Sequence, residues 1–326
     1  MLLEEPLVGV VTSGSTFASG LKLALEFARG RPIQVLVRPS WHVPTLITSY
    51  GKAVAQLGRE HPNAALTFMG STPEDAAVLE KAGLKALHVN KNAFVDERVF
   101  RPDPAAELRY QAVHIAQSQA FKRHDLAYDV EGLALVTYDE EDDRDRLTTL
   151  VASYRGLAYA NVEPDGRQFL LEAEQVREII CRSRCGLVLS DLEGANNASV
   201  EYLLCGVPVI TTPSQGGRDA FFDPRHVRVV EPTAEAVRAA VEAAQAPGMD
   251  PLEIRQGVLD RFRPHRRRLI TWLSQLSGRD LEPAADENLW LPSFRDKLRA
   301  MWLLGRTDDG QRFARPLGSS APIRLA

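Results

Sequence analysis

Short apolar runs alternate with longer amphipathic stretches along the first part of the chain. The apolar runs predict strands, and the stretches between them carry apolar residues at helical spacing. We predict strands at residues 7–12, 33–37, 65–69 and 86–89, with helices at 17–28, 45–58 and 73–82. Alternation of this kind is typical of a parallel sheet covered by helices.

The alternation stops at residues 92–104, where prolines and mixed charges replace the pattern, and we interpret this segment as an interdomain linker. A second series follows, with predicted strands at 112–116, 133–137, 157–160, 187–189, 207–211 and 227–230, and helices at 123–130, 141–154, 171–184, 198–204 and 234–246. Residues 250–278 have a helical pattern. The chain therefore predicts two α/β, Rossmann-like, doubly wound parallel-sheet domains that face a cleft.

The composition is that of an ordinary globular protein. Of 326 residues, 44% are hydrophobic and 25% are charged, which suits two domains with separate cores. The net charge of −4 offers no basic field for nucleic acid, so we expect none to bind. The chain lacks an apolar run of about 20 residues and an N-terminal signal pattern, so we expect a cytoplasmic protein. Cys181, Cys185 and Cys205 are interpreted as core residues.

Two glutamates follow the predicted strand at 187–189. Ligands of parallel sheets bind beyond the carboxyl ends of the strands, which is where Glu193 lies, and Glu201 lies about one turn into the next helix. A carboxylate can accept hydrogen bonds from vicinal sugar hydroxyls. Asn196, Asn197 and Ser199 surround the start of that helix, whose free N–H groups favour an anion such as phosphate.

The same segment continues through CGVPVITT to Gly216 and Gly217, a pair that lets the backbone approach a ligand closely. The segment consists of a glutamate, seven residues, a second glutamate, a helix, GVPVI and a Gly-Gly loop. This order resembles the donor-site signature of retaining GT-B glycosyltransferases, the family-four-like group (glycosyl transferases group 1). The resemblance covers residues 111–246. It implies that Glu193 approaches the donor sugar, that Glu201 binds the ribose, and that Gly216 and Gly217 face the phosphates or the sugar. The alternative makes Glu193 a helix cap and Glu201 a solvated helix residue.

The resembled enzymes hold the donor diphosphate with an arginine, and with a lysine five positions on. Lys122 matches the lysine, whereas Gln117 stands at the arginine position, so Arg123 or Arg218 is left to compensate. A fixed cation stabilises the charge that builds on a leaving diphosphate. We therefore expect Lys122 and Glu193 to be the catalytic pair. In the alternative, the Lys-Arg-His sequence at residues 122–124 is the solvated start of a helix.

Polar loops also follow the first two strands of the first domain. Gly14 and Ser15 belong to a loop rich in Gly and hydroxyl groups, and Trp41 and His42 follow the second strand. An aromatic ring can stack on the apolar face of a sugar while an imidazole bonds to its hydroxyls. We predict acceptor contacts here, against the alternatives of a capping turn and ordinary packing.

By resemblance, residues 1–105 form the acceptor domain, 106–248 the donor-nucleotide domain and 249–304 helices that brace the first domain, before a tail at 305–326. The resemblance implies a nucleotide diphosphate sugar as donor substrate, a hydroxyl acceptor and retention of configuration. It implies no separate cofactor, and the missing Asp-x-Asp motif gives no sign of a catalytic metal.

Two other functions stay open, an epimerase or hydrolase of nucleotide sugars that uses His88 or His124, and a non-catalytic nucleotide- or partner-binding protein. The basic run formed by Arg263, Arg266, Arg267 and Arg268 suits peripheral contact with an anionic membrane or acceptor, or is a solvated face.

Overall fold

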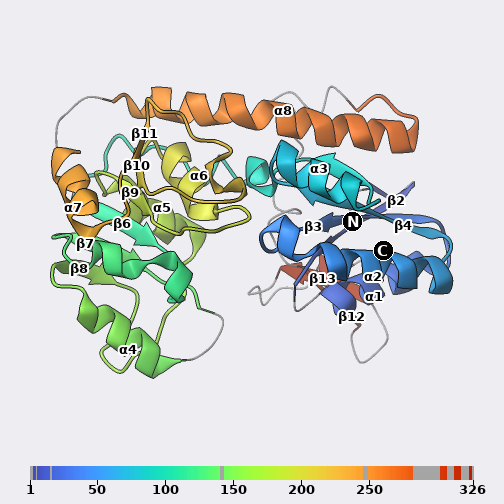
Figure 1. Ribbon diagram of the computed structural model, residues 1–326, viewed down its shortest axis with the longest axis horizontal. Coiled ribbons are helices and arrows are strands. Elements are labelled where there is room, and N and C mark those ends of the chain that lie inside the picture. The colour runs from blue at the N-terminus through green and yellow to red at the C-terminus, as the bar shows by residue number, and fades with distance from the viewer. Residues whose placement is uncertain are drawn as a thin grey trace. The chain divides into compact units, whose positions relative to one another are not determined.

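The chain divides into two compact units in the computed structural model. The structure describes residues 3–4, 6–14, 17–139, 143–244 and 249–281, and the backbone of three strands beyond residue 301. Unit 1 contains Met1–Val95 and Arg263–Ala326, and unit 2 contains Asp96–Phe262 (Figure 1). Each unit is built on its own parallel sheet.

The sheet of unit 1 has the strand order β1-β2-β3-β4-β5, so its order follows the chain without reversal. Strand β1 is antiparallel to β2, and the other pairs are parallel. The strands are β1 (Leu3–Glu4), β2 (Leu7–Thr12), β3 (Ile33–Arg38), β4 (Ala64–Gly70) and β5 (Ala86–His88). The connecting helices are α1 (Phe17–Ala28), α2 (Ile47–Glu60) and α3 (Pro73–Lys81), with 3₁₀ turns η1 (Val43–Thr45) and η2 (Lys91–Phe94).

Apolar residues of β3 and β4 form the centre of the core of unit 1. Val35, Leu36 and Val37 are buried, and the ring of Phe68 lies 4.4 Å from that of Tyr50 in α2. Helix α8 (Pro251–Ser277) begins in unit 2, and its second half belongs to unit 1. There the backbone N–H of Asn90 donates to His265 Nδ1 at 3.1 Å. That half of α8 is therefore part of the folded body of unit 1.

The sheet of unit 2 has the order β11-β10-β9-β6-β7-β8, with all neighbouring strands parallel. Counted along the unit, this is the 3-2-1-4-5-6 order of dinucleotide-binding Rossmann sheets, which reverses between β6 and β9. The strands are β6 (Ala112–Ile115), β7 (Leu133–Val136), β8 (Leu157–Ala160), β9 (Gly186–Val188), β10 (Val209–Thr211) and β11 (Val227–Val229). The helices are α4 (Arg144–Ser153), α5 (Ala173–Cys181), α6 (Asn197–Leu204) and α7 (Ala234–Ala243).

Helices cover both faces of the unit 2 sheet. Leu187 shares a buried cluster with Val237 of α7, whereas the Tyr202 ring of α6 lies so close to Gly186 that any Cβ there would collide with it. Successive residues of a strand point to opposite faces, so α6 and α7 lie on opposite sides of β9. The prediction of two Rossmann-like parallel-sheet domains is confirmed.

The helix predicted at residues 123–130 is wrong. Two short 3₁₀ turns, η3 (Ala120–Lys122) and η4 (His124–Ala127), stand in its place. Arg123 between them has φ 53°, in the left-handed region, which a continuous right-handed helix cannot contain. Strand β12 (Trp302–Arg306) begins at the end of the segment predicted as bracing helices, and β13 (Arg312–Pro316) and β14 (Ile323–Arg324) lie in the predicted tail. The three strands form an antiparallel sheet.

Candidate functional site

The candidate site lies in unit 2, where the strand order reverses between β6 and β9. In open parallel sheets, ligands bind beyond the carboxyl ends of the strands at such a reversal. Lys122 lies in the loop after β6, and Glu193 lies in the loop after β9. The two residues are far apart in sequence, and the topology brings them to one edge of one sheet.

Lys122 and Glu193 form a buried ion pair. The Lys122 ammonium donates to Glu193 Oε1, and each side chain is only 6% exposed. Burial, with a smaller effect of the nearby Arg218 charge, lowers the pKa of Lys122 to about 8, whereas contact with a carboxylate favours the charged ammonium. Glu193 Oε2 accepts a second hydrogen bond from Asn196 Nδ2 at 2.6 Å. Both carboxylate oxygens of Glu193 are thus held in place.

The start of α6 is fixed by the same loop. Asn196 caps the helix because its Oδ1 accepts a hydrogen bond from the Ser199 N–H at 2.8 Å. The Ser199 hydroxyl donates back to the Asn196 carbonyl at 2.8 Å, so this hydroxyl serves the helix turn. Asn197 is half-buried at the first helical position, and Glu201 is buried one turn further on. A solvated position for Glu201 is therefore excluded.

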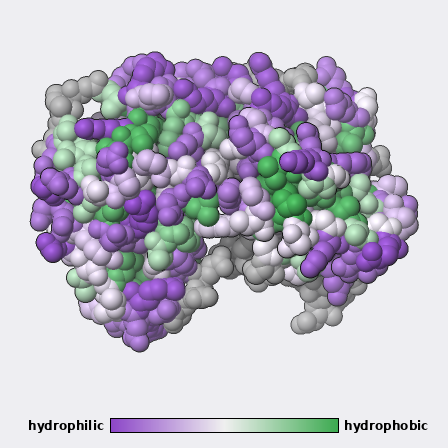
Figure 2. All heavy atoms as spheres, viewed as in Figure 1, coloured by the Kyte–Doolittle hydropathy of each residue, from purple (hydrophilic) through white to green (hydrophobic). Residues whose placement is uncertain are grey.

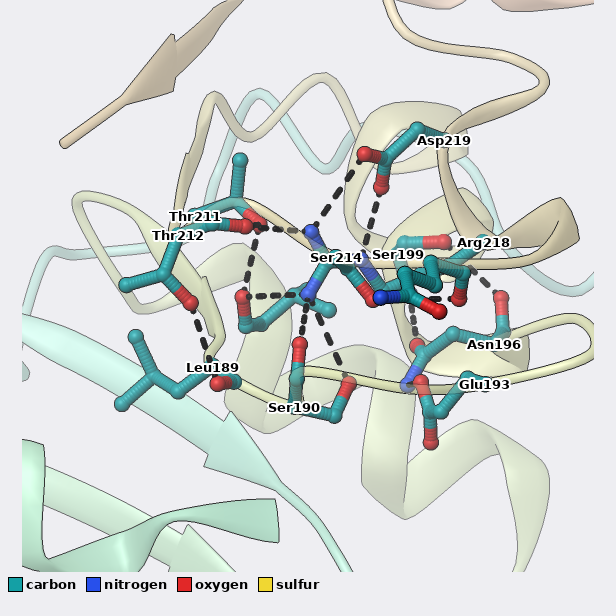
Figure 3. A network of polar contacts seen from close by, with 12 residues as sticks. Leu189, Ser190, Glu193, Asn196, Ser199, Thr211, Thr212, Ser214, Arg218 and Asp219 are labelled. Atoms are coloured by element: carbon teal, nitrogen blue, oxygen red, sulfur yellow. Dashed lines mark hydrogen bonds and ion pairs between the residues drawn. The ribbon is translucent and has the colours of Figure 1, made fainter. Parts of the chain in front are cut away.

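Arg218 ties the loop after β9 to the loop after β10 (Figure 3). Its guanidinium is fully buried and donates to the carbonyls of Ser190 and Thr212, the latter at 2.6 Å. Its Nε donates to Asp219 at 2.6 Å. The donors of Arg218 are therefore taken by the protein itself, and we assign it a structural role. Arg123 donates weakly to the Pro232 carbonyl, at 3.4 Å.

Gly216 is where the loop after β10 meets the backbone of Glu193. Gly216 has φ 94°, and a Cβ at this position would collide with the Glu193 carbonyl oxygen. The Glu193 N–H donates to the Gln215 carbonyl at 3.0 Å, and the two loops also pair at Leu192 and Gln215. Gly217 is buried at the start of η5 (Gly217–Asp219), whereas Gly216 is exposed. Gly216 thus allows the two loops to touch.

A buried histidine fixes the loop that carries Lys122. His124 Nε2 donates to the Gln117 carbonyl at 2.8 Å, so in the neutral ring Nδ1 accepts from the Tyr154 hydroxyl at 2.7 Å. Burial lowers the pKa of His124, which favours this neutral form. Asp139 accepts hydrogen bonds from the N–H of Ser118 at 3.0 Å and from its hydroxyl at 2.9 Å. The loop is therefore anchored at Gln117 and at Ser118.

The acceptor residues predicted in unit 1 lie on two neighbouring loops. Ser13 Oγ accepts from the Ser40 N–H at 3.0 Å, which joins the loop after β2 to the loop after β3. Gly14 has φ 114°, and a Cβ on it would lie 2.9 Å from Ser40 Oγ. Trp41 and His42 follow Ser40 and are half-buried. Ser15 lies outside the described residues.

The basic run near residue 265 is not one exposed face. Arg266 is buried and donates from Nε to the Ala93 carbonyl at 2.7 Å, so its predicted membrane contact is wrong. Arg263 is half-buried, whereas Arg267 and Arg268 are exposed. Residues next to each other in a helix point in different directions, so Arg266 can be buried while Arg267 and Arg268 are exposed. Within the described residues no helix is long and apolar enough to cross a membrane.

Sequence reasoning missed Asp139, Tyr154 and the structural role of Arg218. Asp139 follows the carboxyl end of β7, so its position at a strand end was an available signal. Tyr154 lies at the end of α4, and no local pattern links it to His124. In the part of the chain that the structure describes, no group of three His, Cys, Asp or Glu side chains is placed to hold a metal ion.

Comparison with known proteins identifies the fold through structure alone. No protein-family model matches the chain, and no curated protein matches its sequence. Staphylococcus aureus TarM, solved with fondaparinux, α-GlcNAc-glycerol and UDP, matches with a TM-score of 0.54 and 13% identity over 78% of this chain. The chain spans 58% of the length of that TarM structure.

Two further structures match over a larger share of their own length. Anabaena HepE with UDP-glucose has a TM-score of 0.52 and 13% identity, covering 82% of this chain and 77% of HepE. A trehalose-6-phosphate synthase has a TM-score of 0.53 and 11% identity, covering 83% and 73%. At these identities the likeness establishes the fold, which is GT-B, with two Rossmann-like domains.

Proposed function

We propose that this protein is a glycosyltransferase that transfers a sugar from a nucleotide diphosphate donor to a hydroxyl acceptor. The observation that carries the proposal is the buried Lys122–Glu193 ion pair at the strand reversal of unit 2. A buried ion pair adds little to the stability of a core, because the cost of desolvating the two charges offsets much of the attraction between them. Such pairs at a ligand-binding edge are typical of functional sites.

The donor diphosphate would lie between the loops after β6, β9 and β10. Lys122 has three N–H donors, of which Glu193 accepts one, so it can also donate to the diphosphate. The charge that develops on the leaving diphosphate strengthens this contact in the transition state. Glu193, already oriented by Asn196, would position the donor sugar, and Glu201 would bind the ribose hydroxyls.

The proposal extends to the donor, the stereochemistry and the acceptor of the reaction. TarM was solved with UDP and HepE with UDP-glucose, which favours a nucleotide sugar as donor for this chain too. The trehalose-6-phosphate synthase structure concerns glycosyl transfer with retention, and we expect retention here. We place the acceptor at the loops of Gly14 and Trp41 in unit 1, and expect no catalytic metal. Any membrane contact would use the exposed Arg267 and Arg268.

Thermal unfolding with UDP, GDP, ADP and dTDP tests the donor site. A ligand that binds only the folded state, present at a concentration of one hundred times its Kd, adds about 2.7 kcal/mol to the free energy of unfolding. We expect one diphosphate to raise the Tm of the wild type, and Lys122→Met and Glu201→Gln to lose most of that rise. Lys52→Met, at an exposed position of α2 in unit 1, is the matched control and keeps the full rise.

Incubation of the matching nucleotide sugar with candidate hydroxyl acceptors then tests transfer, with the products identified by mass spectrometry. Release of free nucleoside diphosphate with a glycosylated product supports the proposal. An altered sugar nucleotide without transfer indicates an epimerase. Tight binding that leaves the donor unchanged with every acceptor indicates a non-catalytic protein. No Tm rise with any diphosphate rejects the donor site itself.

A further inference from the structure

A large cavity lies at the other edge of the unit 2 sheet, where β9, β10 and β11 begin. Its volume is about 1220 Å³, which is ample for a ligand the size of a lipid chain or a drug. The β9–β10–β11 register places Gly186, Val209 and Val227 side by side, so the residues just before them form one wall. The donor loops follow the opposite ends of these strands. The cavity is therefore separate from the candidate donor site.

Exposed apolar side chains gather around this cavity. Leu108, Val229, Met249 and Leu252 all line it, with exposed fractions between 46% and 64%. Figure 2 shows hydrophobic residues at the surface over β10 and β11. Single exposed apolar residues are common, but their concentration on one concave surface marks a binding site. The occupant must therefore present an apolar body.

His226 is among the residues that line this cavity, and its buried imidazole has no hydrogen-bond partner. His226 is 5% exposed, and neither of its ring nitrogens has a hydrogen-bond partner in the structure. Its backbone is held in place, since its carbonyl accepts the Val209 N–H at 3.0 Å. Buried polar groups are nearly always hydrogen-bonded, and an imidazole always carries at least one N–H donor. The occupant should therefore also carry an acceptor.

The charges that line the cavity favour an anion. Arg184, just before β9, and Arg228, within β11, have no acidic partner among the described residues. The lining carboxylates are engaged elsewhere, because Asp103 pairs with Arg177 at 3.6 Å and Asp250 caps the start of α8. Two uncompensated guanidinium groups attract a carboxylate or phosphate.

We propose that this cavity binds an organic anion with an apolar body, the class that contains alkyl carboxylates and alkyl phosphates. The apolar chain would lie against Val229 and Leu252, and its head group would accept from His226, Arg184 or Arg228. The proposal does not depend on sugar transfer, because no residue of the donor site takes part in it.

Calorimetric titration of the full chain tests this site, with ten-carbon probes kept below their micellar concentrations. The probes are decanoate, decyl phosphate, neutral decanol and the decyltrimethylammonium cation. We expect at least one anion to bind at least tenfold more tightly than decanol, and the cation not to bind measurably. Raising the salt concentration from 20 to about 300 mM should weaken anion binding, because these arginines are close to solvent.

Charge and imidazole variants localise the binding. The double variant Arg184→Gln/Arg228→Gln should weaken anion binding at least tenfold, and His226→Phe at least fivefold. Arg29→Gln/Arg59→Gln removes two exposed arginines from unit 1 and should stay within twofold of the wild type. Should His226→Phe fail to fold, the arginine pair still decides the matter. Three results would each overturn the proposal. They are equal affinity for decanol and the anions, no binding of either anion, and an unchanged Kd in Arg184→Gln/Arg228→Gln.

Discussion

Lys122 and Glu193 meet as a buried ion pair across the point where the strand order of unit 2 reverses. One side chain comes from a 3₁₀ turn after β6, and the other comes from the loop between β9 and α6. Neither loop could place its charge alone, because each charge would be buried without a partner. The pair therefore links the local structure of two loops to the electrostatics of the site.

Removing one member of this pair should destabilise the protein strongly. Lys122→Met leaves Glu193 as a buried, unpaired carboxylate, and we expect a loss of about 3–5 kcal/mol. Glu193→Gln should cost a similar amount, although the amide can still accept from Asn196. The double variant should cost clearly less than the sum, because neither charge is left alone. Urea denaturation of the four proteins measures the coupling.

Lys52→Met serves as the control for this cycle, since Lys52 is exposed and should change stability by less than about 0.5 kcal/mol. Additive losses in the double variant would show that the two charges do not interact in solution.

The affinity for a nucleoside diphosphate should fall as the pH rises above about 8. The pKa of Lys122 is lowered to about 8 by burial and by Arg218, so the cation proposed to attract the diphosphate is lost above this pH. Between pH 7 and pH 9 we expect a loss of about tenfold, which calorimetry with the diphosphate selected by thermal unfolding can measure. In Lys122→Arg the side chain stays charged, so the affinity of this variant for the diphosphate should change little between pH 7 and pH 9.

This arginine variant also corrects for titration of the ligand. Parallel pH profiles of the two proteins would mean that Lys122 does not touch the diphosphate.

Gly216→Ala should disturb the site more than an ordinary glycine substitution. Gly216 has φ 94° and ψ −162°, a backbone conformation that costs a residue other than glycine about 1–3 kcal/mol, and the new Cβ would also collide with the Glu193 carbonyl. Gly30→Ala is the matched control, because Gly30 has φ 79° and nothing within 4 Å of the added Cβ. We expect Gly216→Ala to lose at least about 1 kcal/mol more by urea denaturation, and to bind the diphosphate more weakly. Equal losses would refute the contact between the two loops.

The stability of unit 1 should decrease in acid through His265. Burial, with the neighbouring His88 and Arg268 charges, lowers the pKa of His265 to about 3, against about 6.5 in an unfolded chain. From pH 6.5 downwards the unfolded chain therefore binds a proton that the folded chain refuses. The free energy of unfolding should fall by up to about 1.4 kcal/mol per pH unit in this window, and show no effect of His265 above it.

His265→Asn keeps an acceptor for the Asn90 N–H but removes the titration. Urea denaturation between pH 4.5 and 7.5 should give a smaller slope for this variant than for the wild type. Identical slopes would contradict the burial of a neutral His265.

The sequence was sufficient for elements with a strong period and for residues at strand ends. Strands and helices of both series are recognisable because buried parallel strands and amphipathic helices have distinct patterns. Lys122, Glu193 and Glu201 were predicted as site residues through a resemblance, and the structure brings the first two into contact. The break at Arg123 could not be predicted, because a left-handed residue other than glycine is imposed by the surrounding contacts. The His124–Tyr154 contact depends on tertiary packing, which no local pattern encodes.

Arg218→Lys tests whether the loops after β9 and β10 depend on one guanidinium. Arg218 reaches the carbonyls of Ser190 and Thr212 and the carboxylate of Asp219 with separate N–H groups. A lysine ammonium is a compact donor that cannot span these three acceptors, so buried carbonyls would lose their partners. We expect a loss of about 2–3 kcal/mol by urea denaturation and weaker diphosphate binding. Arg225→Lys makes the same change at an exposed arginine, and it should cost less than about 1 kcal/mol because Asp223 keeps its ion pair with Arg261. Similar losses in both variants would mean that Arg218 does not hold the two loops together.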